Sequence, residues 1–229
     1  MAAGTKQPER RLDWEGCANV RDLGGLRTAD GRQIRRGALV RGDSPDRLTP
    51  AGWAALQRHG IRTIVDLRND DELHRDAGRP TGVTTVRAPL DGVEDTEFWS
   101  EWSAGPQFGT PLYFRPHIER FPQRNAAAVK AVARAEPGGV LIHCVGGQDR
   151  TGQLTMLLLA LAGVGPEQIA ADYCLSGDPG ADYLARRGTS STEVILATLA
   201  ELDVEAYLRA SGVSDAELAG VRTRLLGPA

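Results

Sequence analysis

The sequence contains few aromatic residues and almost no lysine. Aromatic side chains make up 5% of the 229 residues, and only two of the 27 basic residues are lysines, so arginine supplies nearly all of the positive charge. The formal net charge is −3, which argues against a protein that holds nucleic acid by bulk positive charge. We therefore expect no nucleic-acid partner.

Long apolar runs are also absent from the sequence. No segment approaches the ~18 consecutive apolar residues that a membrane-spanning helix requires, and the longest apolar run, at 154–164, suits a buried helix. Residues 1–11 are polar and contain no apolar stretch of the kind found in signal peptides. The sequence thus predicts a cytoplasmic protein without a membrane span, and it gives no indication of the oligomeric state.

Cysteine is scarce as well. Cys17, Cys144 and Cys174 are too few and too irregularly spaced for a disulfide framework or a zinc site, so we expect neither a metal nor an organic cofactor. A reducing compartment would keep a catalytic thiol usable. Two roles stay open for Cys17 and Cys174: both are inert, or one of them protects an oxidised Cys144 as a reversible disulfide.

Strand-like and helix-like segments alternate along the chain, and the last third is helical. This order predicts a single α/β domain over 13–229, with a central, mostly parallel sheet flanked by helices, after a mobile tail at 1–12. We expect strands at 61–67, 83–90 and 139–143, and a hairpin at 26–40 that turns at Asp30-Gly31. The expected helices are 50–59, 112–134, 150–161, 166–175, 192–210 and 214–226.

The segment 91–110 has a different character, because it mixes acidic and aromatic residues without a clear period. Nearly 20 residues of this kind indicate a functional lid rather than a plain connection. The candidates for contact with a substrate in this lid are Asp91, Asp95, Phe98, Trp99 and Trp102. The aromatic residues fit packing in a minor core equally well.

The segment 140–152 contains Cys144 followed six residues later by Arg150. This pair alone is weak evidence, but a buried strand leads to Cys144, two glycines allow a tight loop, and a helix starts near Arg150. The backbone N–H groups of such a loop can converge on one anion, and Arg150 can bind two phosphate oxygens. The same groups favour a thiolate at Cys144. The predicted phosphate-binding loop consists of Val145, Gly146, Gly147, Gln148 and Arg150.

The run His143-Cys144-x5-Arg150-Thr151-Gly152 resembles the signature of the protein tyrosine phosphatase superfamily. The chain is also similar to one branch of it, the bacterial tyrosine/lipid phosphatases related to mycobacterial tyrosine phosphatase B. The matching segments are 19–25, 39–41, 66–68, 161–164, 169 and 172–173. They follow the order of the family, within about residues 13–185.

This resemblance implies roles for individual residues. Cys144 would be the nucleophile, Arg150 the phosphate clamp and Thr151 a hydroxyl that aids release of the phosphocysteine. His143 would tune the thiolate, although it also fits a core hydrogen bond. The residues that would brace the loop or line its rim are Arg21, Asp22, Asp66 and Arg68.

The sequence departs from the resembled family at two points. The usual Trp-Pro-Asp segment, which supplies the proton for the leaving group, is absent. Asp149 is the better candidate acid, with Asp91 and Asp95 as rivals, although Asp149 also fits a helix N-cap. Gln148 stands where the branch usually has lysine, which removes a cation and argues against multiply phosphorylated inositides as substrates.

These features together predict a metal-independent phosphate monoester hydrolase that works through a phosphocysteine. Phosphotyrosine in a protein is the expected substrate, and a small ring-bearing metabolite such as a nucleotide is the alternative. A rhodanese-like sulfurtransferase also places cysteine between a strand and a helix, and a phosphate-binding module without activity is a further alternative.

Overall fold

The computed structural model describes residues 10–73 and 79–228. Its strands are β1 (Arg21–Asp22), β2 (Leu39–Gly42), β3 (Ile61–Asp66), β4 (Thr84–Arg87) and β5 (Gly139–His143). Its α-helices are α1 (Pro50–Arg58), α2 (Thr96–Trp102), α3 (Phe114–Arg120), α4 (Pro122–Ala133), α5 (Asp149–Leu161), α6 (Pro166–Cys174), α7 (Ala181–Arg186), α8 (Ser191–Glu201), α9 (Val204–Ala210) and α10 (Asp215–Leu226). Short 3-10 helices are η1 (Pro45–Arg47), η2 (Asp70–Glu72) and η3 (Pro111–Tyr113).

The five strands form one sheet in the order β1-β2-β5-β3-β4. Only β1 runs antiparallel to its neighbour, so the predicted, mostly parallel sheet is confirmed. The register pairs His143 of β5 with Gly42 on one side and with Asp66 on the other. Three strands therefore end side by side at the edge from which the chain continues to Cys144, the usual position of a site in such a sheet.

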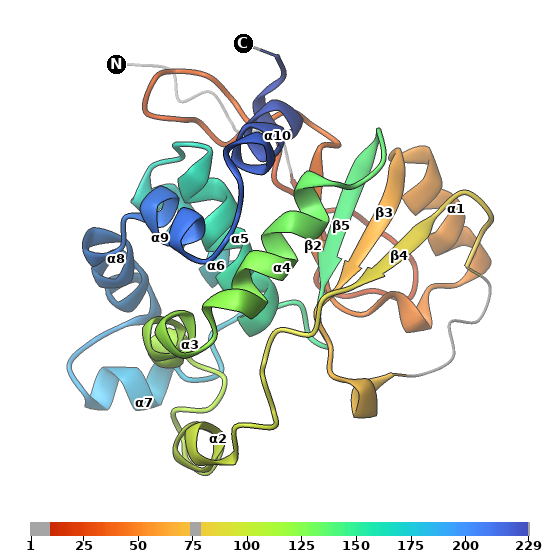
Figure 1. Ribbon diagram of the computed structural model, residues 1–229. Coiled ribbons are helices and arrows are strands. Elements are labelled where there is room, and N and C mark those ends of the chain that lie inside the picture. The colour runs from red at the N-terminus through yellow and green to blue at the C-terminus, as the bar shows by residue number, and fades with distance from the viewer. Residues whose placement is uncertain (1–9, 74–78, 229) are drawn as a thin grey trace, which may run out of the picture.

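Helices cover both faces of the sheet (Figure 1), with α1 on one side and α4 and α5 on the other. Alternate residues of β5 face these two layers: Leu141 packs in a cluster with Trp53 of α1. Ile142 belongs to the larger core that contains Val129 of α4 and Leu158 of α5. Since both faces of the sheet are buried, the strands read as continuous apolar runs in the sequence.

Two predicted helices are each divided in the structure. The predicted helix 112–134 breaks at Phe121, because Pro122 lacks an N–H donor and therefore starts α4 as its first residue. The predicted helix 192–210 breaks before α9, where the Asp203 carboxylate accepts a hydrogen bond from the backbone N–H of Ala206 at 3.0 Å. An N-cap of this kind stabilises a new helix start.

The predicted hairpin at 26–40 forms its turn but little strand. Arg27 and Gln33 make an isolated antiparallel bridge, while regular strand structure begins only at Leu39. The N-terminal prediction also needs correction. Residues 1–9 lie outside the described part of the chain, but the predicted mobile tail does not extend to residue 12. The backbone N–H of Leu12 donates to the Val20 carbonyl at 3.0 Å, and Arg10 pairs with Asp172 at 2.6 Å.

The segment 91–110 contains a short helix, α2, that the sequence did not predict. The Asp95 side chain caps it by accepting from the N–H of Phe98 at 3.0 Å. Within residues 10–73 and 79–228, no helix has both the length and the apolar character needed to cross a bilayer.

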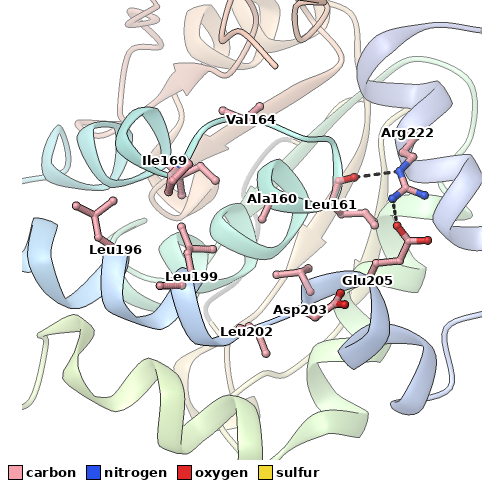
Figure 2. Close-up of a pocket in the computed structure, with 13 residues that line it drawn as sticks. Ala160, Leu161, Val164, Ile169, Leu196, Leu199, Leu202, Asp203, Glu205 and Arg222 are labelled. Carbon is pink, nitrogen blue, oxygen red and sulfur yellow. Dashed lines mark hydrogen bonds and ion pairs between the residues drawn. The ribbon is translucent and has the colours of Figure 1, made fainter. Parts of the chain in front are cut away.

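A mainly apolar pocket of about 380 Å³ lies among the helices α5, α6, α8 and α9, near the last residues of α5 (Figure 2). Ala160, Ile169 and Leu199 line it. At one end, Arg222 pairs with Glu205 and donates to the Leu161 carbonyl at 3.0 Å. None of the described residues that line this pocket is a predicted site residue.

Candidate active site

The segment 144–148 joins the end of β5 to the start of α5, whose first two residues are Asp149 and Arg150. Cys144 is buried, with 4% of its surface exposed. The chain turns at Gly147, whose φ of +71° lies in the left-handed region. A Cβ atom on Gly147 would lie 2.5 Å from the backbone nitrogen of Asp43, so no larger residue fits without a shift of the backbone.

Residues outside the loop hold its carbonyl groups. The Asn19 amide donates to the Gly146 carbonyl at 2.9 Å, and the backbone N–H of Ser44 donates to the Val145 carbonyl at 2.9 Å. The Arg41 guanidinium donates to the carbonyl of Gly147 at 2.9 Å and to that of Gln148 at 3.2 Å. In a trans peptide the N–H of the next residue points the opposite way, so the loop N–H groups point away from these braces. They are thereby available to an anion.

Asp172 holds the arginines that support the loop. Its carboxylate accepts from Arg41 at 2.8 Å, from Arg21 at 3.0 Å and from Arg10 at 2.6 Å, and it is fully buried. Burial alone would raise the pKa of Asp172, but the charges of Arg41 and Arg21 lower it well below its usual range. The predicted brace Arg21 therefore acts on the loop indirectly, through Asp172 and through a 2.9 Å hydrogen bond to Asn19.

Arg150 is held by two carboxylates. Glu72 pairs with both terminal nitrogens of its guanidinium, one of them at 2.7 Å, and Asp91 lies 3.1 Å away. Burial acts to lower the pKa of Arg150, but the hydrogen bonds that it donates to Glu72 and the charge of Asp91 raise the pKa above its usual value. The guanidinium therefore stays charged. The sequence did not single out Glu72. Within its own segment, Glu72 accepts a hydrogen bond from the backbone N–H of Asn69, the N-cap residue of η2, at 2.8 Å.

Two carboxyl groups lie in the same pocket as Arg150: Asp91 is buried and Asp149 is half-buried. Asp149 accepts a hydrogen bond from the Tyr173 hydroxyl at 3.1 Å, and Asp91 accepts one from the Asn69 amide at 2.9 Å. Burial raises the pKa of both carboxyls, although the charge of Arg150 acts in the opposite direction. Both groups therefore bind a proton at higher pH than an exposed aspartate does.

The pocket that contains these groups has a volume of about 350 Å³. Trp99 and Phe108 form its apolar walls, and Gly109 comes close to the Asp149 carboxylate. Its lining residues are Asn69, Asp71, Glu72, Asp91, Val93, Trp99, Ser103, Phe108, Gly109, Tyr113, Asp149 and Arg150.

The structure divides the lid candidates into two groups. Asp91 and Trp99 line the pocket, and the Trp99 indole donates to the Asp91 carbonyl at 3.0 Å. Asp95 instead pairs with Arg120 at 2.6 Å and caps α2, so it does not compete for the role of acid. Phe98 and Trp102 stack on each other with ring centroids 6.2 Å apart. They belong to packing, which was the alternative left open.

Of the residues predicted to brace the loop or line its rim, Arg68 lies beside the loop and Asp22 does not. Arg68 binds Asp66 at 3.0 Å and lines a second pocket, of about 600 Å³, together with Val145 and Gly146. Asp22, by contrast, accepts hydrogen bonds from the backbone of Gly24 at 2.7 Å and of Gly37 at 2.8 Å. It therefore holds the hairpin region and not the loop.

Three residues beside the loop have contacts that bear on their predicted roles. The His143 ring lies 2.9 Å from the Cys144 carbonyl and 3.7 Å from Asp66, and burial lowers its pKa. The Thr151 hydroxyl is buried and has no hydrogen-bond partner among the described residues. Gln148 donates to the Gly177 carbonyl at 3.3 Å and lines neither pocket beside the loop.

The other two cysteines have partners of their own. Cys17 donates to the Ser44 carbonyl at 3.6 Å, and burial, with the nearby charge of Asp43, raises the pKa of its thiol to about 12. A thiol of this kind is a poor nucleophile toward an oxidised cysteine. Cys174 contacts the Thr192 hydroxyl at 3.5 Å.

Comparison with known proteins adds three findings. The model of the tyrosine phosphatase family matches residues 12–227. A Cupriavidus necator protein with a provisional tyrosine-protein phosphatase name is 32% identical over 222 residues, which cover 92% of this chain and 80% of that protein. The triple specificity protein phosphatase PtpB of Mycobacterium tuberculosis is 31% identical over 201 residues, which cover 75% of this chain and 71% of that protein.

Among solved structures, TpbA of P. aeruginosa in complex with phosphotyrosine aligns with 93% of this chain and 100% of its own. The TM-score is 0.46 and the sequence identity 18%, a distant resemblance.

Proposed function

This chain belongs to the tyrosine phosphatase family and is a phosphoric monoester hydrolase, and we propose that Cys144 is its nucleophile, Arg150 its phosphate clamp and Asp149 its general acid. The observation that carries this proposal is the loop between β5 and α5. Its carbonyls are held from outside, its N–H groups point away from these partners, and Arg150 and Asp149 line one pocket.

The reaction proceeds in two steps. The Cys144 thiolate attacks phosphorus, the S–P bond forms, and the bond from phosphorus to the ester oxygen breaks while Asp149 gives that oxygen its proton. Water then attacks the phosphorus of the phosphocysteine and passes a proton to the Asp149 carboxylate. The S–P bond breaks, and phosphate and the Cys144 thiolate are released. The loop N–H groups and Arg150 stabilise the charge on the phosphoryl oxygens in both steps.

Asp149 is preferred to Asp91 as the acid because of its position and support. It is the first residue of α5, next to Arg150, and Tyr173 fixes one of its oxygens. Asp91 lies beside the guanidinium that it neutralises, at 3.1 Å, and a proton on Asp91 would weaken that ion pair.

For the substrate, we propose a phosphate monoester on a flat ring, with phosphotyrosine first and a ring-bearing metabolite second. Trp99 and Phe108 can stack on a ring in the 350 Å³ pocket. Asp71, Glu72 and Asp91 give the same pocket an acidic lining. A second phosphate group would face these carboxylates in a partly desolvated space, which argues against multiply phosphorylated inositides.

Among the acidic residues of the lid, Asp91 lines this pocket. Glu94 instead pairs with Arg124, and Asp95 and Glu97 pair with Arg120. The segment around η2 supplies Asp71 and Glu72. The proposed site requires a reduced Cys144 thiol, which agrees with the cytoplasm as the proposed location.

A substrate screen tests this proposal. Purified protein in EDTA is offered a phosphotyrosine peptide, nucleoside monophosphates, a sugar phosphate and a multiply phosphorylated inositide, with Cys144→Ser as the control. We expect the aryl phosphate to react fastest and Cys144→Ser to be inactive. Inositides as the best substrates would refute the assignment of the substrate, whereas sulfur transfer without phosphatase activity would support the sulfurtransferase alternative.

A further inference from the structure

Tyr113 is a buried residue of the catalytic pocket that the proposed mechanism leaves unused. It ends η3, is 6% exposed and lines the pocket together with Asp149 and Arg150. The hydroxyls of Tyr173 and Tyr207 donate to protein acceptors, at 3.1 and 3.0 Å. The Tyr113 hydroxyl has no hydrogen-bond partner among residues 10–73 and 79–228. The ring of Tyr113 is buried, but its hydroxyl is not one of the enclosed side-chain atoms that lack a partner in the described part of the chain. The hydroxyl is therefore open to the pocket, where it can donate a hydrogen bond to a ligand.

The ring of Tyr113 is held firmly. It packs edge-on against Phe114 with centroids 5.2 Å apart and against His117 at 5.9 Å, and it lies 6.1 Å from Trp99. On the chain before it, the Thr110 hydroxyl accepts from the N–H of Leu112 at 3.4 Å and so caps η3. A ring fixed in this way presents its hydroxyl in one direction, so little conformational entropy is lost when the hydroxyl binds.

The surroundings of Tyr113 make it a donor and not an acid. Burial first, and then the charges of Asp149 and Asp91, raise its pKa well above the usual value for tyrosine. The phenol therefore keeps its proton throughout the pH range in which the enzyme works. A fixed neutral donor stabilises an oxygen on which negative charge develops.

We propose that the Tyr113 hydroxyl donates a hydrogen bond to the ester oxygen of an aryl phosphate as that oxygen leaves phosphorus. The inference rests on the proposed phosphatase function and adds a catalytic residue to it. The S–P bond forms on Cys144, the P–O bond breaks, and the departing oxygen takes its proton from Asp149. Tyr113 loses no proton and shares the developing charge.

The test is Tyr113→Phe, which removes one oxygen and keeps the ring in its packing. No hydrogen bond within the described structure is lost, so the urea midpoint should stay close to that of the wild type. The control is Tyr207→Phe, which removes the hydrogen bond to the Ile118 carbonyl in the helical core. kcat/KM is measured for phenyl phosphate, a poor leaving group, and for p-nitrophenyl phosphate, a good one.

We expect Tyr113→Phe to lower kcat/KM for phenyl phosphate by about 10- to 100-fold and that for p-nitrophenyl phosphate by about 3-fold or less. Tyr207→Phe should affect both substrates equally. Equal losses in Tyr113→Phe, or none, would overturn the inference while leaving the phosphatase function in place. Failure of the proposed function is distinct, because the wild type would then hydrolyse neither ester.

A second comparison separates direct contact from positioning. In an Asp149→Asn background the ester oxygen departs with more negative charge. Adding Tyr113→Phe there should therefore lower kcat/KM for phenyl phosphate by at least the same factor as it does in the otherwise wild-type protein. If Tyr113 acted only by positioning Asp149, its loss would change nothing in that background. The urea midpoints of all variants are measured in parallel.

Discussion

At the scale of single residues, the site combines one contiguous motif with side chains from distant segments. Cys144, Asp149 and Arg150 could be identified in the sequence because the loop places them close together. Glu72 and Tyr113 could not, because each reaches the pocket only through the tertiary fold. Glu72 belongs to a run of acidic residues of the kind that is typical of an exposed segment. In the structure it nevertheless binds Arg150, which is 78 residues away in the sequence.

The role of Asp149 can be tested through the leaving group. Asp149→Asn should lower kcat for phenyl phosphate by about 10²–10⁴-fold, the usual contribution of a positioned acid. The effect on p-nitrophenyl phosphate should be much smaller, because nitrophenolate leaves without a proton. Asp91→Asn serves as the matched variant, and a loss that depends on the leaving group in Asp91→Asn alone would move the acid role to Asp91.

The pH dependence should follow the same carboxyl. An acid must be protonated to act, so activity on phenyl phosphate should fall as the pH rises through the pKa of Asp149. Because burial raises that pKa, this limb should lie above the ordinary range of an aspartate. The pH profile of kcat/KM for phenyl phosphate should lose the falling limb in Asp149→Asn, and a limb that persists unchanged would argue against Asp149.

At the scale of elements, the conformation of the loop depends more on Gly147 than on Gly146. A methyl group on Gly147 would meet the backbone of Asp43 and would also stand at a positive φ, whereas one on Gly146 would meet no atom within 4 Å. Gly147→Ala should therefore lower kcat/KM for p-nitrophenyl phosphate by about 10-fold or more, since strain of this kind costs about 1–3 kcal/mol.

Gly146→Ala is the matched control and should stay within about 3-fold of the wild type. A comparable loss of kcat/KM in both variants would mean that the loop tolerates no side chain at either position. The close approach of Gly147 to Asp43 would then not explain the loss in Gly147→Ala. The urea midpoint, measured for each variant, separates loss of the loop from loss of the fold.

Element boundaries show where sequence patterns were insufficient. The expected strands at 61–67 and 139–143 formed as β3 and β5, because their apolar runs match strands that are buried on both faces. The break at Pro122 was readable from the chemistry of proline, but the apolar pattern continued through it. The helix α2 was missed because it has only seven residues, too few for a helical period to stand out from the surrounding loop.

At the scale of the molecule, a buried cluster of charges links the loop to the helical half. Asp172 lies on α6 and holds arginines from the N-terminal segment, β1 and β2. The sequence could supply the alternation of strands and helices, and hence the α/β class. It could not show that these charges meet, because they come together only when the sheet and α6 pack.

Asp172→Asn tests the importance of this cluster for stability. Loss of one partner of a buried ion pair should lower the free energy of unfolding by about 3–5 kcal/mol at pH 7. The folded pKa of Asp172 lies well below its unfolded value of about 3.9. Its contribution is therefore fully present above that value and is lost as the pH falls through the folded pKa.

Urea unfolding of the wild type and the variant should thus differ most at neutral pH and converge as the pH falls below about 4. Asp30→Asn is the control, because its ion pair with Arg32 is solvent-exposed, and its removal should change stability little. A difference between wild type and Asp172→Asn that stays constant with pH would show that the carboxylate charge is not responsible.

The most direct test of the central claim is detection of the covalent intermediate on Cys144. The protein reacts with p-nitrophenyl phosphate in EDTA, the reaction is stopped with acid within the first turnovers, and the peptides are analysed by mass spectrometry. We predict that the peptide containing Cys144 gains the mass of one phosphoryl group in the wild type, and that Cys144→Ser shows neither this gain nor turnover. A phosphoryl group on another residue, or hydrolysis by Cys144→Ser at more than a trace of the wild-type rate, would contradict the account.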